Sequence, residues 1–237
     1  AEEEAEALVA AAGADRARLE QLVARRLTGE PLAWIVGHTV FAGHRITVTP
    51  GVYVPRPHTE EVVAKRAVHH LPAAGVAVDA CTGSGALALT LSRARPGARV
   101  VATDVDPAAV ACARANGVDA LLGDLLAPVP ADLAGRVDVV VAVVPYVPTP
   151  ALPLLQRDTF RFESALAYDG GPDGARLLRR LAADARALLR SGGHLVAELG
   201  GDQAGAIRAE LAALGYLDPT VLTDDEGDPR AVEARWR

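Results

Sequence analysis

Apolar positions in the first fifty residues change from a helical spacing to an alternating one. Residues 2–27 carry apolar side chains three and four positions apart, and the pattern breaks at Gly13-Ala14-Asp15, which predicts two short helices. The segment TVFAGHRITVTPG then alternates around Ala42-Gly43-His44, as is typical of a β-hairpin. A Pro-Gly pair follows, so we expect a helical segment with a hairpin over residues 1–50 and a main domain over 51–237.

From residue 59 onward, segments with helical spacing alternate with short apolar runs. The predicted helices span 59–70 (with Thr59 as the cap), 86–94, 107–117, 175–193 (ended by two glycines) and 203–214. The predicted strands span 76–80, 98–104, 118–124, 137–144, 194–200, 219–223 and 231–236. Strands that alternate with helices predict an α/β fold with a doubly wound, seven-stranded, mostly parallel sheet.

Charge and composition narrow the possible functions. The net charge is −6 and no basic run occurs, which argues against a face that binds nucleic acid. Cys81 and Cys112 are the two cysteines, and no spacing suits a metal, so we expect neither a disulfide framework nor a bound metal. The sequence shows no signal peptide and no apolar run as long as a membrane span. We therefore expect a cytoplasmic protein that does not bind membranes.

The segment DACTGSGALA, residues 79–88, joins a predicted strand to a predicted helix through small residues. Gly83 and Gly85 allow the backbone to approach a ligand that a Cβ atom would displace. In doubly wound sheets the ligand lies beyond the carboxyl ends of the strands, where this loop is expected. The same run also fits the GxGxxA pattern of nicotinamide dinucleotide sites, so the loop by itself leaves the cofactor open.

Three aspartates stand at the ends of successive predicted strands. Asp79 would face a pyrophosphate unfavourably, but it can accept hydrogen bonds from a cationic amino-acid group. Asp104 is placed to bind two ribose hydroxyls, and Asp124 to accept a hydrogen bond from an adenine amino group. This set favours S-adenosylmethionine over a dinucleotide, with the adenine near Asp124 and Leu125.

From about Glu30 to its end the chain resembles the protein-(glutamine-N5) methyltransferases that modify the GGQ glutamine of release factors. The resemblance rests on EPLAWIVGH, VPRPHTE, DACTGSGA, SALAYDGGPDG, GGHLVAELGGDQ and DDEGDPRAV, which occur in the family's order. It implies a class I, Rossmann-like methyltransferase fold that uses S-adenosylmethionine and transfers a methyl group to a nitrogen. The residues predicted to bind this cofactor are Arg56, Thr59, Asp79, Cys81, Thr82, Gly83, Ser84, Gly85, Asp104, Val105, Asp124 and Leu125.

The family's substrate loop, Asn-Pro-Pro-Tyr, falls on Val143-Val144-Pro145-Tyr146, which are the predicted catalytic residues. In that loop the Asn side chain and the following carbonyl hold the amide NH2 group, and the Tyr forms a wall of the site. Val143 lacks this acceptor, and an unpaired buried donor costs about 1–3 kcal/mol, which slows transfer about ten- to a hundredfold. Cys81 replaces the first glycine of the family's loop, and the segment before EPL is shorter than the family's N-terminal domain.

These departures leave the acceptor open between a release factor or another glutamine-bearing protein and a small molecule. Without the Asn, the loop suits a more nucleophilic acceptor, or one with fewer hydrogens, better than an amide. A relative that binds the cofactor without turnover is a further alternative. DNA adenine methylation is disfavoured by the charge and by the lack of a target-reading domain. Glu163 and Arg161 lie in a candidate substrate lid, and Glu198 is expected to close the sheet.

Overall fold

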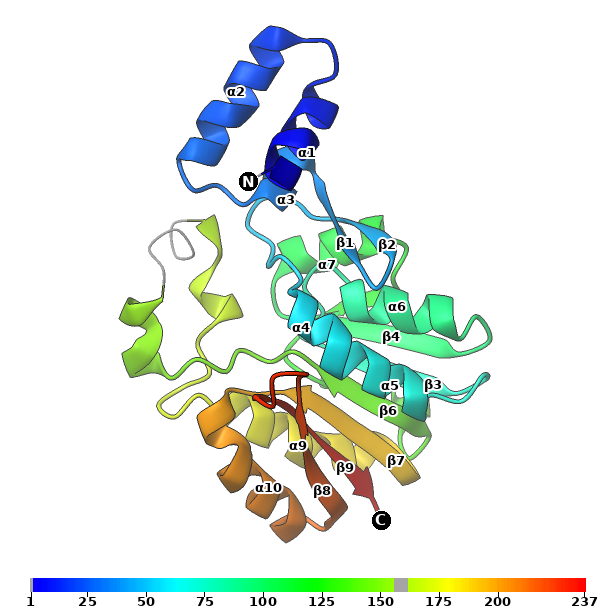
Figure 1. Ribbon diagram of the computed structural model, residues 1–237. Coiled ribbons are helices and arrows are strands. Elements are labelled where there is room, and N and C mark those ends of the chain that lie inside the picture. Colours follow the sequence, from blue (N-terminus) through cyan, green and yellow to red (C-terminus); the bar gives the residue numbers. More distant parts are fainter. Residues whose placement is uncertain (1, 156–161) are drawn as a thin grey trace.

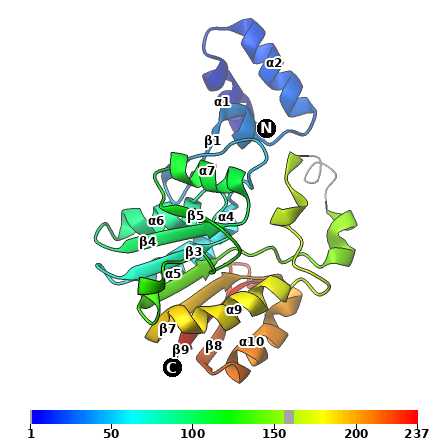
Figure 2. The same ribbon diagram turned by 180° about the vertical axis from the view of Figure 1, so that it is seen from behind.

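The centre of the molecule is a seven-stranded sheet with the order β5-β4-β3-β6-β7-β9-β8 (Figures 1 and 2). The computed structural model describes residues 2–155 and 162–237, without the side chains of residues 60 and 61. The strands are β3 (Val76–Ala80), β4 (Arg99–Asp104), β5 (Ala120–Leu122), β6 (Val137–Ala142), β7 (Leu189–Glu198), β8 (Tyr216–Thr223) and β9 (Pro229–Trp236). Neighbouring strands pair in parallel from β5 to β7, and β9 runs antiparallel to both β7 and β8. The predicted α/β class and its mostly parallel sheet are confirmed.

The apolar run in β6 follows from its place in the middle of the sheet. All six of its residues are buried. Val139 and Val141 pack in the core on one face, whereas Val140 and Ala142 pack in the core on the other. Helices cover both faces, with α5–α7 on one side and α9 on the other (Figures 1 and 2). These helices are α5 (Lys65–His70), α6 (Ala86–Ala94), α7 (Pro107–Ala115), α9 (Arg176–Leu188) and, beside β8, α10 (Ala204–Ala213). A strand covered on both faces needs apolar side chains at nearly every position, and the one charged residue of β6, Asp138, pairs with Arg190 at 2.6 Å.

The N-terminal segment contains the predicted helices and hairpin. Its elements are α1 (Glu2–Ala12), α2 (Arg16–Leu27), α3 (Leu32–Val36), β1 (His38–Phe41) and β2 (His44–Thr47). The helices share a small core of their own, formed by Leu8, Ala12, Leu22 and Ile35. The hairpin residues Phe41 and Ile46 belong instead to the large core on the α5–α7 face of the sheet.

The predicted helix 175–193 is wrong at its C-terminal end. Helix α9 stops at Leu188, and Leu189 already pairs with Val137 as the first residue of β7. Leu189 is buried in the core on the α9 face, and this tertiary pairing overrides the glycine stop signal. Gly193 lies inside the strand, where a Cβ atom would come within 2.8 Å of the Val137 carbonyl oxygen.

Two further boundary differences concern predicted site residues. The helix expected from Thr59 begins as α4 (Pro57–Thr59) and continues through the π-helical turn Glu60–Ala64 into α5. The hydroxyl of Thr59 donates to Glu198 at 2.5 Å instead of capping a helix. Strand β5 ends at Leu122, so Asp124 follows the strand and does not end it. Arg161, a residue of the expected lid, lies outside the described residues.

No helix within residues 2–155 and 162–237 is long and apolar enough to cross a membrane. The same ranges contain no cluster of three or more His, Cys, Asp or Glu side chains placed to hold a metal. The expected lack of a metal stays a prediction.

Candidate functional site

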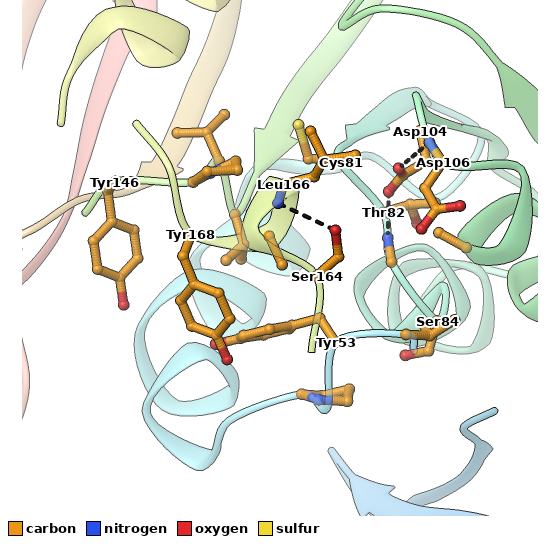
Figure 3. A pocket seen from close by; sticks show the side chains of 18 of the residues that line it. Tyr53, Cys81, Thr82, Ser84, Asp104, Asp106, Tyr146, Ser164, Leu166 and Tyr168 are labelled. Atoms are coloured by element: carbon orange, nitrogen blue, oxygen red, sulfur yellow. Dashed lines mark hydrogen bonds between the residues drawn. The ribbon is translucent and has the colours of Figure 1, made fainter. Parts of the chain in front are cut away.

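A cavity of about 480 Å³ lies at the carboxyl ends of the central strands (Figure 3). The loop after β3 forms one wall and the loop after β6 another, so the two predicted halves of the site face a common space. The predicted residues that line it are Arg56, Thr59, Asp79, Cys81, Thr82, Gly83, Ser84, Asp104, Val105, Asp124, Leu125, Val143, Val144, Pro145 and Tyr146. Gly85 is the predicted site residue that does not line the cavity.

The two glycines of the loop after β3 have different surroundings. Gly83 has φ +57°, and a Cβ atom there would meet nothing within 4 Å, so its backbone faces open space in the cavity wall. A Cβ atom on Gly85 would lie 2.9 Å from Val118 Cγ2 and 3.0 Å from Ala113 Cβ. Gly85 therefore lets α6 pack closely on the α7 region, which is a different role from the expected ligand approach. Cys81 occupies the left-handed region with φ +56° although it is not glycine.

Asp79 is 1% exposed and uses one of its two carboxylate oxygens. Oδ2 accepts from Thr82 Oγ1 at 2.6 Å and from the Ala88 amide at 3.1 Å. Among the described residues, Oδ1 and Ser84 Oγ are buried without a hydrogen-bond partner. Burial raises the pKa of Asp79 to about 7, against the lowering effect of its two donors. Unpaired buried polar atoms are rare in proteins, so this wall suits a ligand that brings hydrogen-bond donors.

The other two predicted aspartates are partly engaged within the protein. Asp104 accepts from the amides of Gly83 and Asp106, both at 2.9 Å, and burial raises the pKa of its carboxyl. A carboxylate has about four acceptor positions, so ribose hydroxyls can still bind. Asp124 Oδ2 accepts from Arg180 Nη2 at 2.6 Å in an exposed ion pair, so its role as the adenine acceptor stays a prediction that depends on its remaining acceptor positions.

The loop after β6 turns away from the sheet at Val143 and runs beside a segment that follows it in the chain. Val144 is buried and Val143 is half-buried. The Val147 amide donates to the Tyr168 carbonyl at 2.9 Å, and the Gly170 amide donates to the Val147 carbonyl at 2.9 Å. Burial, and after it the nearby carboxylate of Glu198, raises the pKa of Tyr146. The residues in the place of Asn-Pro-Pro-Tyr are therefore held in one defined position at the cavity.

A third wall is aromatic and was not predicted. The rings of Tyr53 and Tyr168 meet edge to face with centroids 5.8 Å apart, and the Arg56 guanidinium lies 5.0 Å from the Tyr53 centroid. Arg56 also donates to the buried carboxylate of Glu163 at 3.1 Å. Burial raises the pKa of Tyr53 to about 12. Arg56 thus lies at the cavity, but its charge is paired with Glu163.

Several lining residues that sequence reasoning missed lie in a motif that it had noted. Figure 3 places Ser164, Leu166 and Tyr168 along the cavity, and all three belong to SALAYDGGPDG. Asn116 was also missed, although it links two walls of the site. Its side chain donates to the carbonyls of Thr47 and Ser84 at 2.9 and 2.8 Å, so it ties the hairpin to the loop after β3.

Comparison with known proteins found relatives that match most of the chain. No family model matches the chain. The release factor glutamine methyltransferase of Moorella thermoacetica is 42% identical over 99% of this chain and 83% of its own length. The protein of the same name from Mycolicibacterium smegmatis is 39% identical over 92% of this chain and 79% of its own. The 4-amino-L-phenylalanine/4-methylamino-L-phenylalanine methyltransferase of Streptomyces pristinaespiralis is 38% identical over 84% of this chain and 70% of its own.

Solved structures support the fold. The ribosomal protein L11 methylase of Lactobacillus delbrueckii subsp. bulgaricus has a TM-score of 0.54 and 20% identity, over 80% of this chain and 83% of its own. A T. thermophilus 16S rRNA N2 G1207 methyltransferase in complex with AdoMet and guanosine has the same TM-score and identity, over 84% of this chain and 44% of its own. The predicted class I fold and S-adenosylmethionine dependence are confirmed. By its identity to relatives over nearly its whole length, the chain belongs to the release factor glutamine methyltransferase family.

Proposed function

We propose that this protein transfers a methyl group from S-adenosylmethionine to the side-chain amide nitrogen of a glutamine in a release factor. The observation that carries the proposal is that the predicted cofactor loop and the predicted substrate loop line one cavity. One wall presents the unpaired Asp79 Oδ1 and Ser84 Oγ, and the other presents the loop from Val143 to Tyr146. The names of the Moorella and Mycolicibacterium relatives support the acceptor. Since the substrate belongs to translation, we place the protein in the cytoplasm and expect it to contact neither nucleic acid nor membrane directly.

The residues after β3, β4 and β5 would hold the cofactor, which supplies an electrophilic methyl group when bound. Asp79 Oδ1 and Ser84 would accept from and donate to the amino-acid part, because each has an unused polar atom. Asp104 would hold the ribose hydroxyls through its remaining acceptor positions. Val105 and Leu125, both at the cavity, would contact the adenine.

The loop after β6 would orient the acceptor. An amide nitrogen is a weak nucleophile, because its lone pair is delocalised into the carbonyl. The loop must therefore turn the NH2 group so that the lone pair faces the methyl carbon and the hydrogens meet acceptors. Val143 offers a methyl surface where the family has an amide oxygen, which leaves the carbonyl of Val144 as the acceptor. With the cofactor bound, an N–C bond would replace the C–S bond of the methyl group, and the nitrogen would lose one proton to solvent.

An aromatic amine is the alternative acceptor that an experiment must separate from the amide. The Streptomyces pristinaespiralis relative is named for 4-amino-L-phenylalanine. Three of the four tyrosines of the chain, Tyr53, Tyr146 and Tyr168, line the cavity. An arylamine is more nucleophilic than an amide and needs less help from an acceptor at position 143.

A transfer assay with labelled S-adenosylmethionine tests the proposal. Three acceptors are compared at equal concentration: a release factor, the same release factor with its GGQ glutamine changed to alanine, and 4-amino-L-phenylalanine. We expect label in the first and not in the second, and a rate with the amine at least tenfold lower. Faster labelling of the amine would show a small-molecule enzyme. Calorimetric binding of S-adenosylmethionine with no label on any acceptor would show a protein without turnover.

A further inference from the structure

The backbone of the loop after β6, residues 143–146 (the acceptor loop), is held by a side chain that follows the neighbouring strand β7. Gln203 lies in the turn Gly201–Gln203 between β7 and α10. Its Nε2 donates to the Tyr146 carbonyl at 2.7 Å and to the Asp173 carbonyl at 3.2 Å. Its Oε1 accepts from the Gly200 amide at 3.2 Å. Both ends of the Gln203 amide are therefore engaged, and together they join three segments.

Two glycines make room for this arrangement. A Cβ atom on Gly174 would lie 2.3 Å from both Gln203 Nε2 and the Tyr146 carbonyl oxygen. A Cβ atom on Gly170 would lie 2.7 Å from the Pro145 carbonyl oxygen. Contacts below 3.0 Å with backbone atoms cannot be accommodated without a shift of the chain. The chain thus has no side chain at Gly170 and Gly174, where it passes beside the Gln203–Tyr146 hydrogen bond.

The end of β7, just before this turn, reaches the side-chain end of Tyr146. Glu198 is the last residue of β7 and is buried. Its carboxylate accepts from Thr59 Oγ1 at 2.5 Å and meets His58 Nε2 at 3.3 Å. It also interacts with the Tyr146 phenol. The residues from Glu198 to Gln203 therefore hold Tyr146 at both ends, by its carbonyl and by its ring.

Because the acceptor loop begins with the apolar Val143, methyl transfer depends more on the position of its backbone than it would in a loop that begins with a polar residue. Val143 cannot anchor the loop to the acceptor with a side-chain hydrogen bond. The direction of the Val144 carbonyl then decides how an acceptor nitrogen is presented, and that direction depends on the fixed backbone at Pro145 and Tyr146. A displacement of about 1 Å is enough to cost about a hundredfold in rate.

We propose that Gln203 is a positioning residue for methyl transfer, which fixes the backbone of the acceptor loop through the Tyr146 carbonyl. Gln203 is not among the residues that line the cavity, so it acts through Tyr146. The inference deepens the proposed function, because it takes the loop after β6 as the acceptor side of the site.

Kinetics of Gln203→Met provide the first test, since this change keeps the side-chain length and removes both polar atoms. We expect kcat for the release factor to fall at least tenfold, whereas the KM for S-adenosylmethionine stays within twofold. Asp202→Asn is the matched control, because Asp202 is exposed in the same turn, and it should keep wild-type kcat. An unchanged kcat in Gln203→Met would overturn the proposal.

A pH profile separates positioning from general destabilisation. In Gln203→Glu an ionised carboxylate faces the carbonyls of Tyr146 and Asp173 and cannot donate, whereas a protonated one can. The activity of Gln203→Glu relative to wild type should therefore rise as the pH is lowered from 8 to 5.5. The same ratio for Gln203→Met should stay flat. A flat ratio for both variants would contradict the assigned hydrogen bond.

Hydrogen exchange tests, without requiring any methyl acceptor, whether Gln203 fixes the acceptor loop. With S-adenosylmethionine bound, peptides that cover residues 143–149 should exchange faster in Gln203→Met than in wild type or Asp202→Asn, at equal calorimetric affinity for the cofactor. Equal exchange in all three proteins would overturn the proposal. If wild-type protein transfers no methyl group to a release factor, the proposed function fails, but this exchange experiment still decides the role of Gln203.

Discussion

At the residue scale, Asp79 couples protonation to the fold and to ligand binding. Burial raises the pKa of its carboxyl from an ordinary 3.8 to about 7. Between these values the unfolded chain is ionised and the folded chain keeps its proton. The unfolded state therefore gains stability as the pH rises from about 4 to about 7, and the ligand-free protein loses free energy of unfolding over that range. A cationic ligand on Asp79 Oδ1 reverses this penalty, because it favours the ionised form.

Asp79→Asn should weaken S-adenosylmethionine binding about ten- to a hundredfold at pH 8, since a hydrogen bond to a charged group contributes about 1.5–3 kcal/mol. The Kd of the wild-type protein should rise as the pH falls below 7, when the carboxyl takes up its proton, and the Kd of the variant should not. Calorimetry at pH 6, 7 and 8 measures both effects. Asp119→Asn, at an exposed position away from the cavity, is the control, and equal affinity of Asp79→Asn and wild type would contradict the assignment.

Val143 is the second residue on which the account depends. Val143→Asn restores an acceptor for one amide hydrogen, which corresponds to about 1–3 kcal/mol, so the rate with a release factor should rise about ten- to a hundredfold. Val143→Leu, which is also apolar, should not raise the rate. Both are measured as kcat at saturating cofactor. A Val143→Asn rate equal to wild type would show that this asparagine is not needed in this chain.

At the element scale, α5 is joined to the sheet by a polar cluster on the side away from the cavity. The rings of His70 and His194 stack with centroids 3.7 Å apart, and Glu233 on β9 pairs with Arg66 and His70. Burial, and after it His70, lowers the pKa of His194 to about 4. Burial by itself would raise the pKa of Glu233, but hydrogen bonds from Arg66 and His70 hold it below its ordinary value.

This cluster predicts acid sensitivity. A histidine whose folded pKa lies below the unfolded value near 6.5 contributes stability above that pH, and the contribution is lost as the pH falls toward 4. Between pH 7 and 5 the wild-type protein should lose about 1 kcal/mol of unfolding free energy through His194, after allowance for its partial exposure. His194→Phe keeps an aromatic ring on His70 and should remove this loss. Urea denaturation of both proteins at both pH values is the measurement, because Asp79 acts in the opposite direction in each of them, and an equal pH dependence in the variant and the wild type would refute the assignment.

At the scale of the whole molecule, helices α1 and α2 rest on a core separate from that of the sheet, whereas α3 contributes to both cores. Leu8, Ala12, Leu22 and Ile35 form that core, whereas the β1–β2 hairpin packs into the main one. Segments with few buried contacts open at low free energy. We therefore expect amides in α1 and α2 to exchange faster than those in β3 and β6. Leu22→Ala should speed exchange in α1 and α2 and leave β6 unchanged; a change that reaches β6 would show one cooperative unit.

Much of the fold could be predicted from sequence because its signals are local. A continuous apolar run such as that of β6 identifies a strand buried on both faces, and Gly83 identifies the loop after β3. The end of α9 could not be predicted, because Leu189 leaves the helix to pair with Val137, which is distant in the sequence.

The residues around the cavity divide in the same way, into those marked by local sequence signals and those placed by contacts between distant segments. Their main loops follow from motifs, but the contacts between loops do not. Gln203 on Tyr146 and Asn116 on Thr47 join segments 57 and 69 residues apart. A glutamine or an asparagine in a turn carries no mark of a partner so far along the chain. For Gly85 the sequence pattern predicts close approach of a ligand. Its neighbours in the fold show instead that it allows close packing between helices.

The most direct test of the account is to locate the transferred methyl group. Release factor is incubated with wild-type protein and S-adenosylmethionine, digested, and sequenced by tandem mass spectrometry. We predict one added methyl group on the side-chain amide of the GGQ glutamine, about ten- to a hundredfold less abundant when Asp79→Asn replaces the wild type at limiting cofactor. A methyl group on another residue, or an unmodified release factor beside a methylated aromatic amine, would contradict the account.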